Sequence, residues 1–285
     1  MSLLLDEIRR AAARLAEAEV DSPRADAEQL AAYVHGVGRG ELHMVPDDAF
    51  DVRFWAAVDR RAAREPLQHI TGEAHFRYLE LSIGPGVFAP RPETEVVTGW
   101  AIDWLRETGA TAPVAADLGT GSAAIALSIA LEVPGAVVHA VEADPLALSF
   151  AERNVAAYRD REPSAGRRVR LTSADLATAL RGLDGTVDLV VSNPPYIPLG
   201  SSVPPEVAEY DPPSALWSGA DGLDAIRAVQ AAARRLLRPG GAVAVEHGAP
   251  QGEAVRQVFA SAGRWRHITQ HQDLAGRDRF VTAVR

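Results

Sequence analysis

Asp117-Leu118-Gly119-Thr120-Gly121-Ser122-Ala123-Ala124 is the stretch that decides the fold, because it joins a strand-like run to a helix-like run. Glycines at such a turn let the backbone bend sharply and let a ligand approach without a Cβ in the way. The next strand-like run ends in Glu142, at about the 20-residue distance where a carboxylate accepts hydrogen bonds from ribose hydroxyls. The combination predicts a site for a ligand that contains a ribose.

The loop alone leaves the class of enzyme open. Its spacing Gly119-x-Gly121-x-x-Ala124 fits the dinucleotide fingerprint in the Gly/Ala form, which is typical of nicotinamide and flavin enzymes. A methyltransferase is equally compatible with the stretch, and a tight turn without any ligand is a third alternative. Residues elsewhere in the chain have to decide between them.

Strand-like and helix-like runs alternate over residues 93–285. No helical run separates the last two strands, so we expect these two to pair antiparallel. The alternation predicts an open, mostly parallel, Rossmann-like α/β sheet of seven strands, with ligands beyond the carboxyl ends of the strands. The predicted strands are 114–118, 137–142, 169–172, 187–192, 242–246, 265–271 and 280–284.

The chain before this domain has a different pattern. Apolar residues recur there at helical spacing, as at Leu4, Ile8 and Ala11, which predicts a small α-helical bundle. Apolar and polar residues then alternate around Gly84-Pro85-Gly86, which predicts a β-hairpin that turns at these residues. We therefore expect a helical domain at 1–72, a hairpin linker at 73–92 and a catalytic domain at 93–285.

Asn193-Pro194-Pro195-Tyr196 follows the apolar strand 187–192 and decides the chemistry. The Asn193 side-chain carbonyl and the Pro194 backbone carbonyl can each accept a hydrogen bond from one N–H of a planar NH2 group. Consecutive prolines fix φ and donate no hydrogen bond, so the acceptors stay rigid. Tyr196 can stack on the flat face of an amide or a base. A dehydrogenase has no use for this tetrapeptide, so the two motifs together predict a methyltransferase.

The expected substrate group is an amide or amino nitrogen. An amide nitrogen is a poor nucleophile because its lone pair is delocalised into the carbonyl. Two acceptors aimed at its hydrogens favour a pyramidal nitrogen whose lone pair points at the methyl donor, so positioning supplies most of the catalysis. A general base beside the nitrogen is not required, because the proton becomes acidic once the nitrogen is methylated.

Composition removes several other classes of protein. The chain has no cysteine, and all 29 basic residues are arginine, which excludes a thiolate site, a Schiff-base lysine and a P-loop lysine. The net charge of −9 argues against nucleic acid as the substrate, because phosphate binding usually needs a basic face. His267 and His271 have metal-ligand spacing but lie in a predicted strand without a third ligand, so we predict no metal site. No apolar run reaches about 20 residues, so we expect a cytoplasmic protein without a membrane span.

Nearly the whole chain resembles the release factor glutamine methyltransferase family. Asn-Pro-Pro-Tyr alone is shared with adenine-N6 and guanine-N2 methyltransferases. The segments 90–95 and 273–279 are more specific to this family. The similar segments are 65–72, Pro90-Arg91-Pro92-Glu93-Thr94-Glu95, 117–126, 193–197, 219–224 and Asp273-Leu274-Ala275-Gly276-Arg277-Asp278-Arg279.

The resemblance implies a class I S-adenosylmethionine-dependent methyltransferase whose helical domain recognises class I peptide chain release factors. The methylated group would be the side-chain amide of the glutamine in a Gly-Gly-Gln motif. The implied cofactor-binding residues are Gly119, Thr120, Gly121, Ser122, Ala123, Glu142, Leu176 and Asn193. The glutamine would be held by Asn193, Pro194, Pro195 and Tyr196, of which Asn193, Pro194 and Tyr196 are the implied catalytic residues.

This sequence departs from the family at three of the implied cofactor residues. Ala123 stands where glycine is usual, Glu142 where aspartate is usual, and Leu176 where an aromatic residue is common. These changes bear on cofactor affinity and leave the methyl-transfer chemistry intact. The alternative function is an rRNA or DNA amino methyltransferase that uses the same Asn-Pro-Pro-Tyr chemistry on a flipped base.

Overall fold

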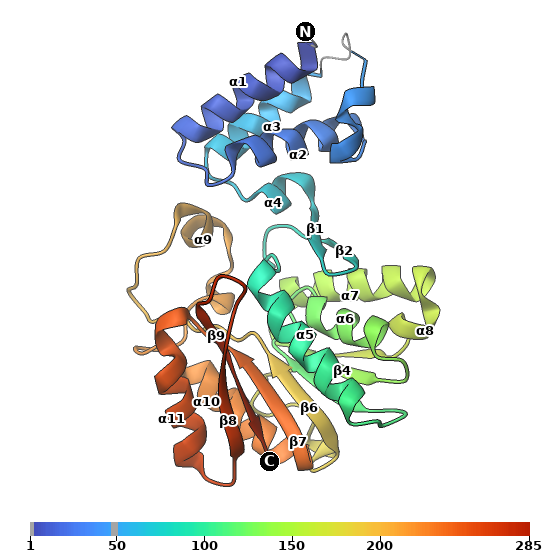
Figure 1. Ribbon diagram of the computed structural model, residues 1–285, viewed down its shortest axis with the longest axis vertical. Helices are drawn as coiled ribbons and strands as arrows, with labels where there is room; N and C mark the ends of the chain where they lie inside the picture. The colour runs from blue at the N-terminus through green and yellow to red at the C-terminus, as the bar shows by residue number, and fades with distance from the viewer. Residues whose placement is uncertain (1–2, 47–50) are drawn as a thin grey trace. The chain divides into compact units, whose positions relative to one another are not determined.

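The computed structural model describes residues 3–46 and 51–285, and its chain forms two compact units (Figure 1). One unit comprises Met1–Glu73 and Val203–Tyr210, and the other comprises Ala74–Ser202 and Asp211–Arg285. A late segment of the chain therefore groups with the N-terminal helices. The domain bounds 1–72, 73–92 and 93–285 stay predictions.

The first unit is helical, as the apolar spacing indicates. Ile8, Leu15, Leu30 and Val58 are fully buried in one core, where each removes apolar surface from water. Its elements are α1 (Leu3–Glu17), α2 (Pro23–His35), the 3-10 helix η1 (Arg39–Met44), α3 (Val52–Ala62), α4 (Leu67–Thr71) and α9 (Pro205–Tyr210).

Ion pairs rather than apolar packing hold α9 in the helical unit, because α9 has no buried residue. Glu206 accepts hydrogen bonds from Arg61 at 3.3 Å and from Arg64 at 2.6 Å. Arg61 is itself buried and also pairs with Asp26 at 2.8 Å. The Tyr210 hydroxyl donates to the carbonyl of Ala63 at 3.4 Å. A short helix without an apolar face is thus fixed by charge.

The predicted hairpin is present, but its predicted turn is wrong. Strands β1 (Glu73–Phe76) and β2 (Leu79–Ser82) pair with each other, and the chain turns between them, at Arg77, rather than at 84–86. Arg77 has a φ of 52°, a conformation that favours glycine. Its backbone N–H donates to Glu95 at 3.1 Å and its guanidinium pairs with Glu132 at 2.6 Å. These bonds stabilise a turn that glycine would otherwise form.

The second unit contains the predicted seven-stranded sheet, in the order β5-β4-β3-β6-β7-β9-β8. Strands β5, β4, β3, β6 and β7 run parallel, and β9 pairs antiparallel with both β7 and β8. The class I fold and the terminal antiparallel pair are thereby confirmed. The strands are β3 (Val114–Leu118), β4 (Val137–Glu142), β5 (Val169–Ser173), β6 (Val187–Ser192), β7 (Leu237–Glu246), β8 (Arg266–Gln272) and β9 (Asp278–Val284).

Helices cover both faces of this sheet, so its central strands are apolar on both sides (Figure 1). One apolar core lies under α5, α6 and α7, and the other lies under α10 and α11. The helices are α5 (Pro92–Glu107), α6 (Ala124–Glu132), α7 (Pro145–Arg161), α8 (Pro163–Gly166), α10 (Asp224–Leu236) and α11 (Gly252–Ala262).

Candidate active site

The residues singled out in the sequence gather at one edge of the sheet, where the parallel strands end. The Gly119 loop follows β3, Glu142 ends β4, Leu176 follows β5 and Asn193 follows β6. Strands β3 and β6 are neighbours, with Asp117 beside Val191, so the glycine loop and Asn193 leave the sheet side by side. Such an edge of an open α/β sheet is where ligands bind.

The glycine loop leaves space for a ligand next to its backbone. Gly119 and Gly121 have φ angles of 76° and 56°, and a Cβ added to either would meet no atom within 4 Å. Ala123 adopts the same left-handed conformation, at a φ of 67°, although it carries a Cβ. Below the loop, the buried Asp117 accepts hydrogen bonds from the Thr120 hydroxyl at 2.6 Å and from the Ala126 N–H at 3.1 Å. These bonds fix the loop from inside the protein.

Glu142 is bonded to the backbone around it. One carboxylate oxygen accepts from the Gly121 N–H at 2.9 Å, and the other accepts from the N–H groups of Ala143 and Asp144 at 2.9 Å. The strand-end acid therefore ties β4 to the glycine loop. A carboxylate offers about four lone-pair positions, so it retains capacity for a ribose hydroxyl.

Asn193 and Pro194 present two unpaired acceptors beside this loop. Asn193 Nδ2 donates to Thr94 Oγ1 at 3.1 Å. Across residues 3–46 and 51–285, no group donates to Asn193 Oδ1 or to the Pro194 carbonyl, although Asn193 is half-buried and Pro194 buried. The site is thus complementary to a ligand that carries two N–H donors.

Neighbouring bonds make the chain around these acceptors rigid. The Ser192 hydroxyl donates to the Leu118 carbonyl at 2.5 Å and joins β6 to β3. Gln251 Nε2 donates to the Tyr196 carbonyl at 2.8 Å, and Ile197 forms a parallel bridge with Trp217. Both ends of the tetrapeptide are therefore attached to the sheet domain.

Glu246, at the end of β7, belongs to the site although the sequence motifs do not include it. Its side chain is 1% exposed, and burial raises the pKa of its carboxyl to about 7. The Thr94 and Tyr196 hydroxyls lower that pKa as hydrogen-bonding neighbours, as does the charge of Arg279, whereas Glu93 raises it. Arg279 pairs in turn with Asp273 at 3.2 Å. The sequence indicates this cluster only through the family resemblance of segments 90–95 and 273–279, which contain Thr94 and Arg279.

Tyr196 has a second set of contacts beyond its proposed stacking role. Its ring packs against the core under α10 and α11, while burial and the Glu246 charge raise the pKa of its hydroxyl. Leu176 is partly buried and packs against the same core. Arg91, from the family-like segment before α5, pairs with the buried Asp211 at 2.9 Å. Arg91 thus anchors the end of the loop that follows the tetrapeptide.

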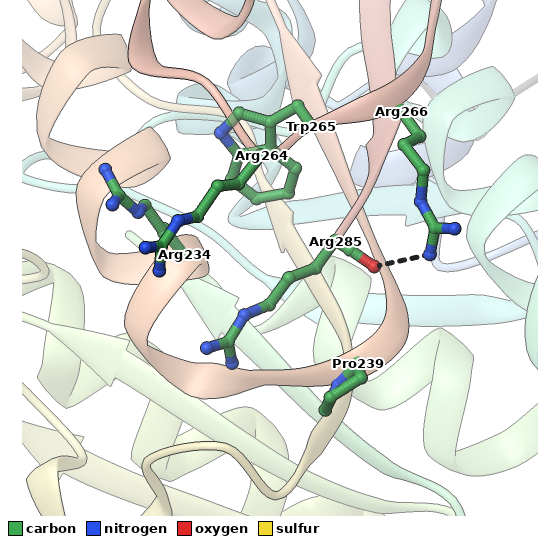
Figure 2. Close-up of a pocket in the computed structure, with 6 residues that line it drawn as sticks. All are labelled: Arg234, Pro239, Arg264, Trp265, Arg266 and Arg285. Atoms are coloured by element: carbon green, nitrogen blue, oxygen red, sulfur yellow. Dashed lines mark hydrogen bonds between the residues drawn. The ribbon is translucent and has the colours of Figure 1, made fainter.

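A separate pocket of about 400 Å³ lies elsewhere on the same unit (Figure 2). It lies at the start of β7 and β8 and the end of β9, which is the edge of the sheet opposite Asn193. Its lining residues are Arg234, Pro239, Arg264, Trp265, Arg266 and Arg285. The guanidinium groups suit an anion, but their position excludes this pocket from chemistry at the glycine loop.

The described residues contain neither a metal cluster nor a membrane-spanning helix. Among those residues, no group of three or more His, Asp or Glu side chains could hold a metal ion. Within 3–46 and 51–285, none of the helices combines the length and apolar character that crossing a membrane requires.

Comparison with known proteins assigns both parts of the chain. Residues 6–72 match the PrmC N-terminal domain, and residues 79–208 match the methyltransferase small domain. A release factor glutamine methyltransferase from Streptomyces coelicolor is 56% identical, over 99% of this chain and 98% of that protein. A 4-amino-L-phenylalanine/4-methylamino-L-phenylalanine methyltransferase from Streptomyces pristinaespiralis is 41% identical, over 93% of this chain and 88% of that protein. A methyltransferase structure from Pyrococcus furiosus, at 18% identity, shares the fold with a TM-score of 0.51 and covers 82% of this chain and 98% of its own.

Proposed function

The chain belongs to the release factor glutamine methyltransferase family, and from this premise we propose its substrate and its site. It transfers a methyl group from S-adenosylmethionine to the glutamine side-chain amide in the Gly-Gly-Gln motif of class I release factors. The reaction takes place in the cytoplasm, where release factors act.

One observation carries the assignment of the site. The two unpaired acceptors, Asn193 Oδ1 and the Pro194 carbonyl, lie beside a glycine loop with open space along its backbone. A primary amide has two N–H donors in one plane, which matches two fixed acceptors. A nitrogen held there faces whatever the loop binds, so the geometry favours transfer from a cofactor to an NH2 group.

Each residue of the tetrapeptide 193–196 has its own role in the proposed reaction. Asn193 and Pro194 each accept one N–H of the glutamine amide and turn the nitrogen lone pair towards the methyl group. Pro195 stiffens the backbone, and Tyr196 covers one face of the amide. The bound cofactor would supply the methyl group, and the methylated nitrogen would lose one proton to solvent.

The loop and strand ends fit an adenosyl cofactor. When bound, S-adenosylmethionine supplies an electrophilic methyl group on a sulfonium sulfur. Gly119, Thr120, Gly121, Ser122 and Ala123 would lie along it, because Cβ-free backbone permits close approach. Glu142 would accept from the ribose hydroxyls, Leu176 would contact the adenine, and Asn193 would lie near both ligands.

Two other amine substrates are the alternatives to test. A nucleic-acid base is disfavoured by the net charge of −9 and by the full-length similarity to release factor enzymes. An aromatic amine is suggested by the relative from Streptomyces pristinaespiralis. The match of residues 6–72 to the PrmC N-terminal domain favours the release factor.

Asn193→Ala tests the function and the site together. The variant should lose at least about a hundredfold in kcat, the usual effect of removing one preorganised polar contact to a transition state. Its affinity for S-adenosylmethionine should change little, because the lost oxygen acts on the nitrogen. Mass spectrometry of the Gly-Gly-Gln peptide measures turnover, and calorimetry measures cofactor binding.

Ser201→Ala, an exposed position on the same loop, is the control and should retain activity. Transfer to rRNA, DNA or 4-amino-L-phenylalanine, with none to the release factor, would refute the proposed substrate. Near-normal kcat in Asn193→Ala would refute the proposed site.

A further inference from the structure

Thr94 and Glu246 connect to Asn193 in series from two different elements. Asn193 Nδ2 donates to Thr94 Oγ1 at 3.1 Å, and Thr94 lies in the first turn of α5. Glu246 lies at the end of β7, and the nearby Thr94 hydroxyl lowers the pKa of its carboxyl. Thr94 and Glu246 are 3% and 1% exposed, so water does not replace these contacts.

The chemistry of the three groups gives this series one direction. A hydroxyl that accepts a hydrogen bond keeps its own proton to donate elsewhere. Above about pH 7 the Glu246 carboxyl is ionised and only accepts, so it takes that proton from Thr94. The chain of donors therefore runs from the Asn193 NH2 to the Thr94 hydroxyl and ends on Glu246. The Asn193 oxygen is left to face the opposite way.

This direction matters because the two ends of an asparagine amide have nearly the same size. Packing alone does not distinguish the oxygen from the NH2, whereas hydrogen-bond partners do. An Asn193 side chain turned by half a rotation would aim N–H groups at the substrate N–H groups. The acceptor on which methyl transfer depends would then be replaced by a repulsive donor.

We propose that Thr94 and Glu246 are positioning residues, which hold the Asn193 amide with its oxygen towards the substrate nitrogen. The inference rests on the proposed function and adds two residues to its site. The Tyr196 hydroxyl and the charge of Arg279 lower the pKa of the Glu246 carboxyl, and Arg279 pairs with Asp273 at 3.2 Å. Thr94 and Arg279 come from the family-like segments 90–95 and 273–279. These two segments thus lie close to the Asn193 side-chain amide.

Substitution of Thr94 tests the kinetic consequence. Thr94→Val removes the hydroxyl and should lower kcat at least about tenfold, which corresponds to about 1.4 kcal/mol in the barrier. The KM for S-adenosylmethionine should stay within about twofold, because the orientation of Asn193 acts on the methylated nitrogen. Thr94→Ser restores the hydroxyl and should recover most of the rate.

Thr98→Val is the matched control on the same helix. Thr98 is fully buried, but its hydroxyl donates to the Thr94 carbonyl at 2.8 Å rather than to Asn193. It should retain the wild-type kcat if only the link to Asn193 matters. Equal losses in Thr94→Val and Thr98→Val, or no recovery in Thr94→Ser, would overturn the proposal.

Glu246→Gln gives an independent variant should Thr94→Val fold poorly. The new amide can donate to the Thr94 oxygen and reverse the donor chain, so kcat should again fall about tenfold or more. A Glu246→Gln enzyme with wild-type kcat would contradict the role of Glu246.

A measurement that needs no substrate separates this inference from the proposed function. The chain contains only two asparagines, Asn154 and Asn193, so 15N-asparagine labelling gives two side-chain NH2 pairs in an NMR spectrum. Asn154 Nδ2 donates to the Ser82 and Ser122 carbonyls at 3.2 and 3.0 Å, away from Thr94. Thr94→Val should shift or broaden the Asn193 pair and leave the Asn154 pair unchanged.

Two failures can then be distinguished. Wild-type protein that does not methylate a release factor, but whose Asn193 pair responds to Thr94→Val, refutes the substrate and retains the positioning. An active wild type whose Asn193 pair and kcat are both insensitive to Thr94→Val refutes the positioning and retains the substrate.

Discussion

Gly119 offers a way to separate folding from cofactor binding at a single residue. Its φ is 76°, and a Cβ added there would meet no protein atom within 4 Å. Gly119→Ala should therefore cost only the left-handed strain, about 1–2 kcal/mol. Its new methyl group would project into the space proposed for S-adenosylmethionine, so cofactor affinity should fall by more than about tenfold, or about 1.4 kcal/mol. Urea unfolding and calorimetry measure the two effects.

Gly135→Ala is the control for the same change outside the site. Gly135 has a φ of 87°, and an added Cβ would lie 2.1 Å from the Thr111 carbonyl oxygen. It should destabilise the fold more than Gly119→Ala does and leave the cofactor affinity of the folded protein unchanged. A larger loss of cofactor affinity in Gly135→Ala than in Gly119→Ala would rule out the glycine loop as the cofactor site.

Sequence motifs point to the local part of the proposed site but not to its distributed part. Gly119, Glu142 and Asn193 stand at or just after the ends of recognisable strands, so pattern and motif were enough to find them. Thr94 bonds to Asn193, and Glu246 lies near Thr94, only because α5 and β7 converge at one edge of the sheet, and no spacing in the sequence encodes that approach. Burial of Glu246, which gives it chemical importance, is likewise a tertiary effect.

Among the elements, α9 provides the sharpest test of charge as a source of local order. Glu206→Ala removes the carboxylate that Arg61 and Arg64 share and leaves the buried Arg61 with Asp26 and the Glu65 carbonyl. Because α9 has no buried residue, its amides should exchange with deuterium several-fold faster in the variant. Glu209→Ala, on the exposed side of the same helix, should leave exchange unchanged. Equal protection in both variants would contradict the role of the ion pairs.

The regular elements of the sheet could be predicted because alternating strands and helices have strong periodic patterns. The hairpin turn could not, since the bonds of Arg77 to Glu95 and Glu132 replace the glycine that such a turn usually shows. The grouping of α9 with the N-terminal helices was also beyond the sequence, because an ion pair between residues 61 and 206 leaves no local pattern.

For the molecule as a whole, two buried carboxyls should make stability depend on pH. Burial raises the pKa of Asp117 and that of Glu246 to about 7, above their ordinary values of 3.8 and 4.5. Between the ordinary and raised values the folded chain holds protons that the unfolded chain releases. The resulting stabilisation is complete below the ordinary pKa and is lost as pH rises through about 7.

Glu246→Gln should remove part of this dependence. The variant should gain stability relative to wild type at pH 8, on the order of 1–3 kcal/mol, and gain less at pH 5.5. Urea unfolding at both pH values measures the difference. Glu253→Gln, exposed on α11, is the control. It should change the free energy of unfolding by the same small amount at both pH values. A larger gain at pH 5.5 than at pH 8 would show that the Glu246 carboxyl is not held neutral by burial.

The chain passes between its two units three times, after Glu73, after Ser202 and after Tyr210. A chimaera that takes its helical unit from a relative must therefore inherit residues 203–210 from the same parent. An exchange at residue 73 alone would take Arg61 and Arg64 from the relative but keep Glu206 of this chain. The ion pairs between them would then join residues from two different parents. Recombination among such enzymes is thus expected to succeed with two matched segments and to fail with one.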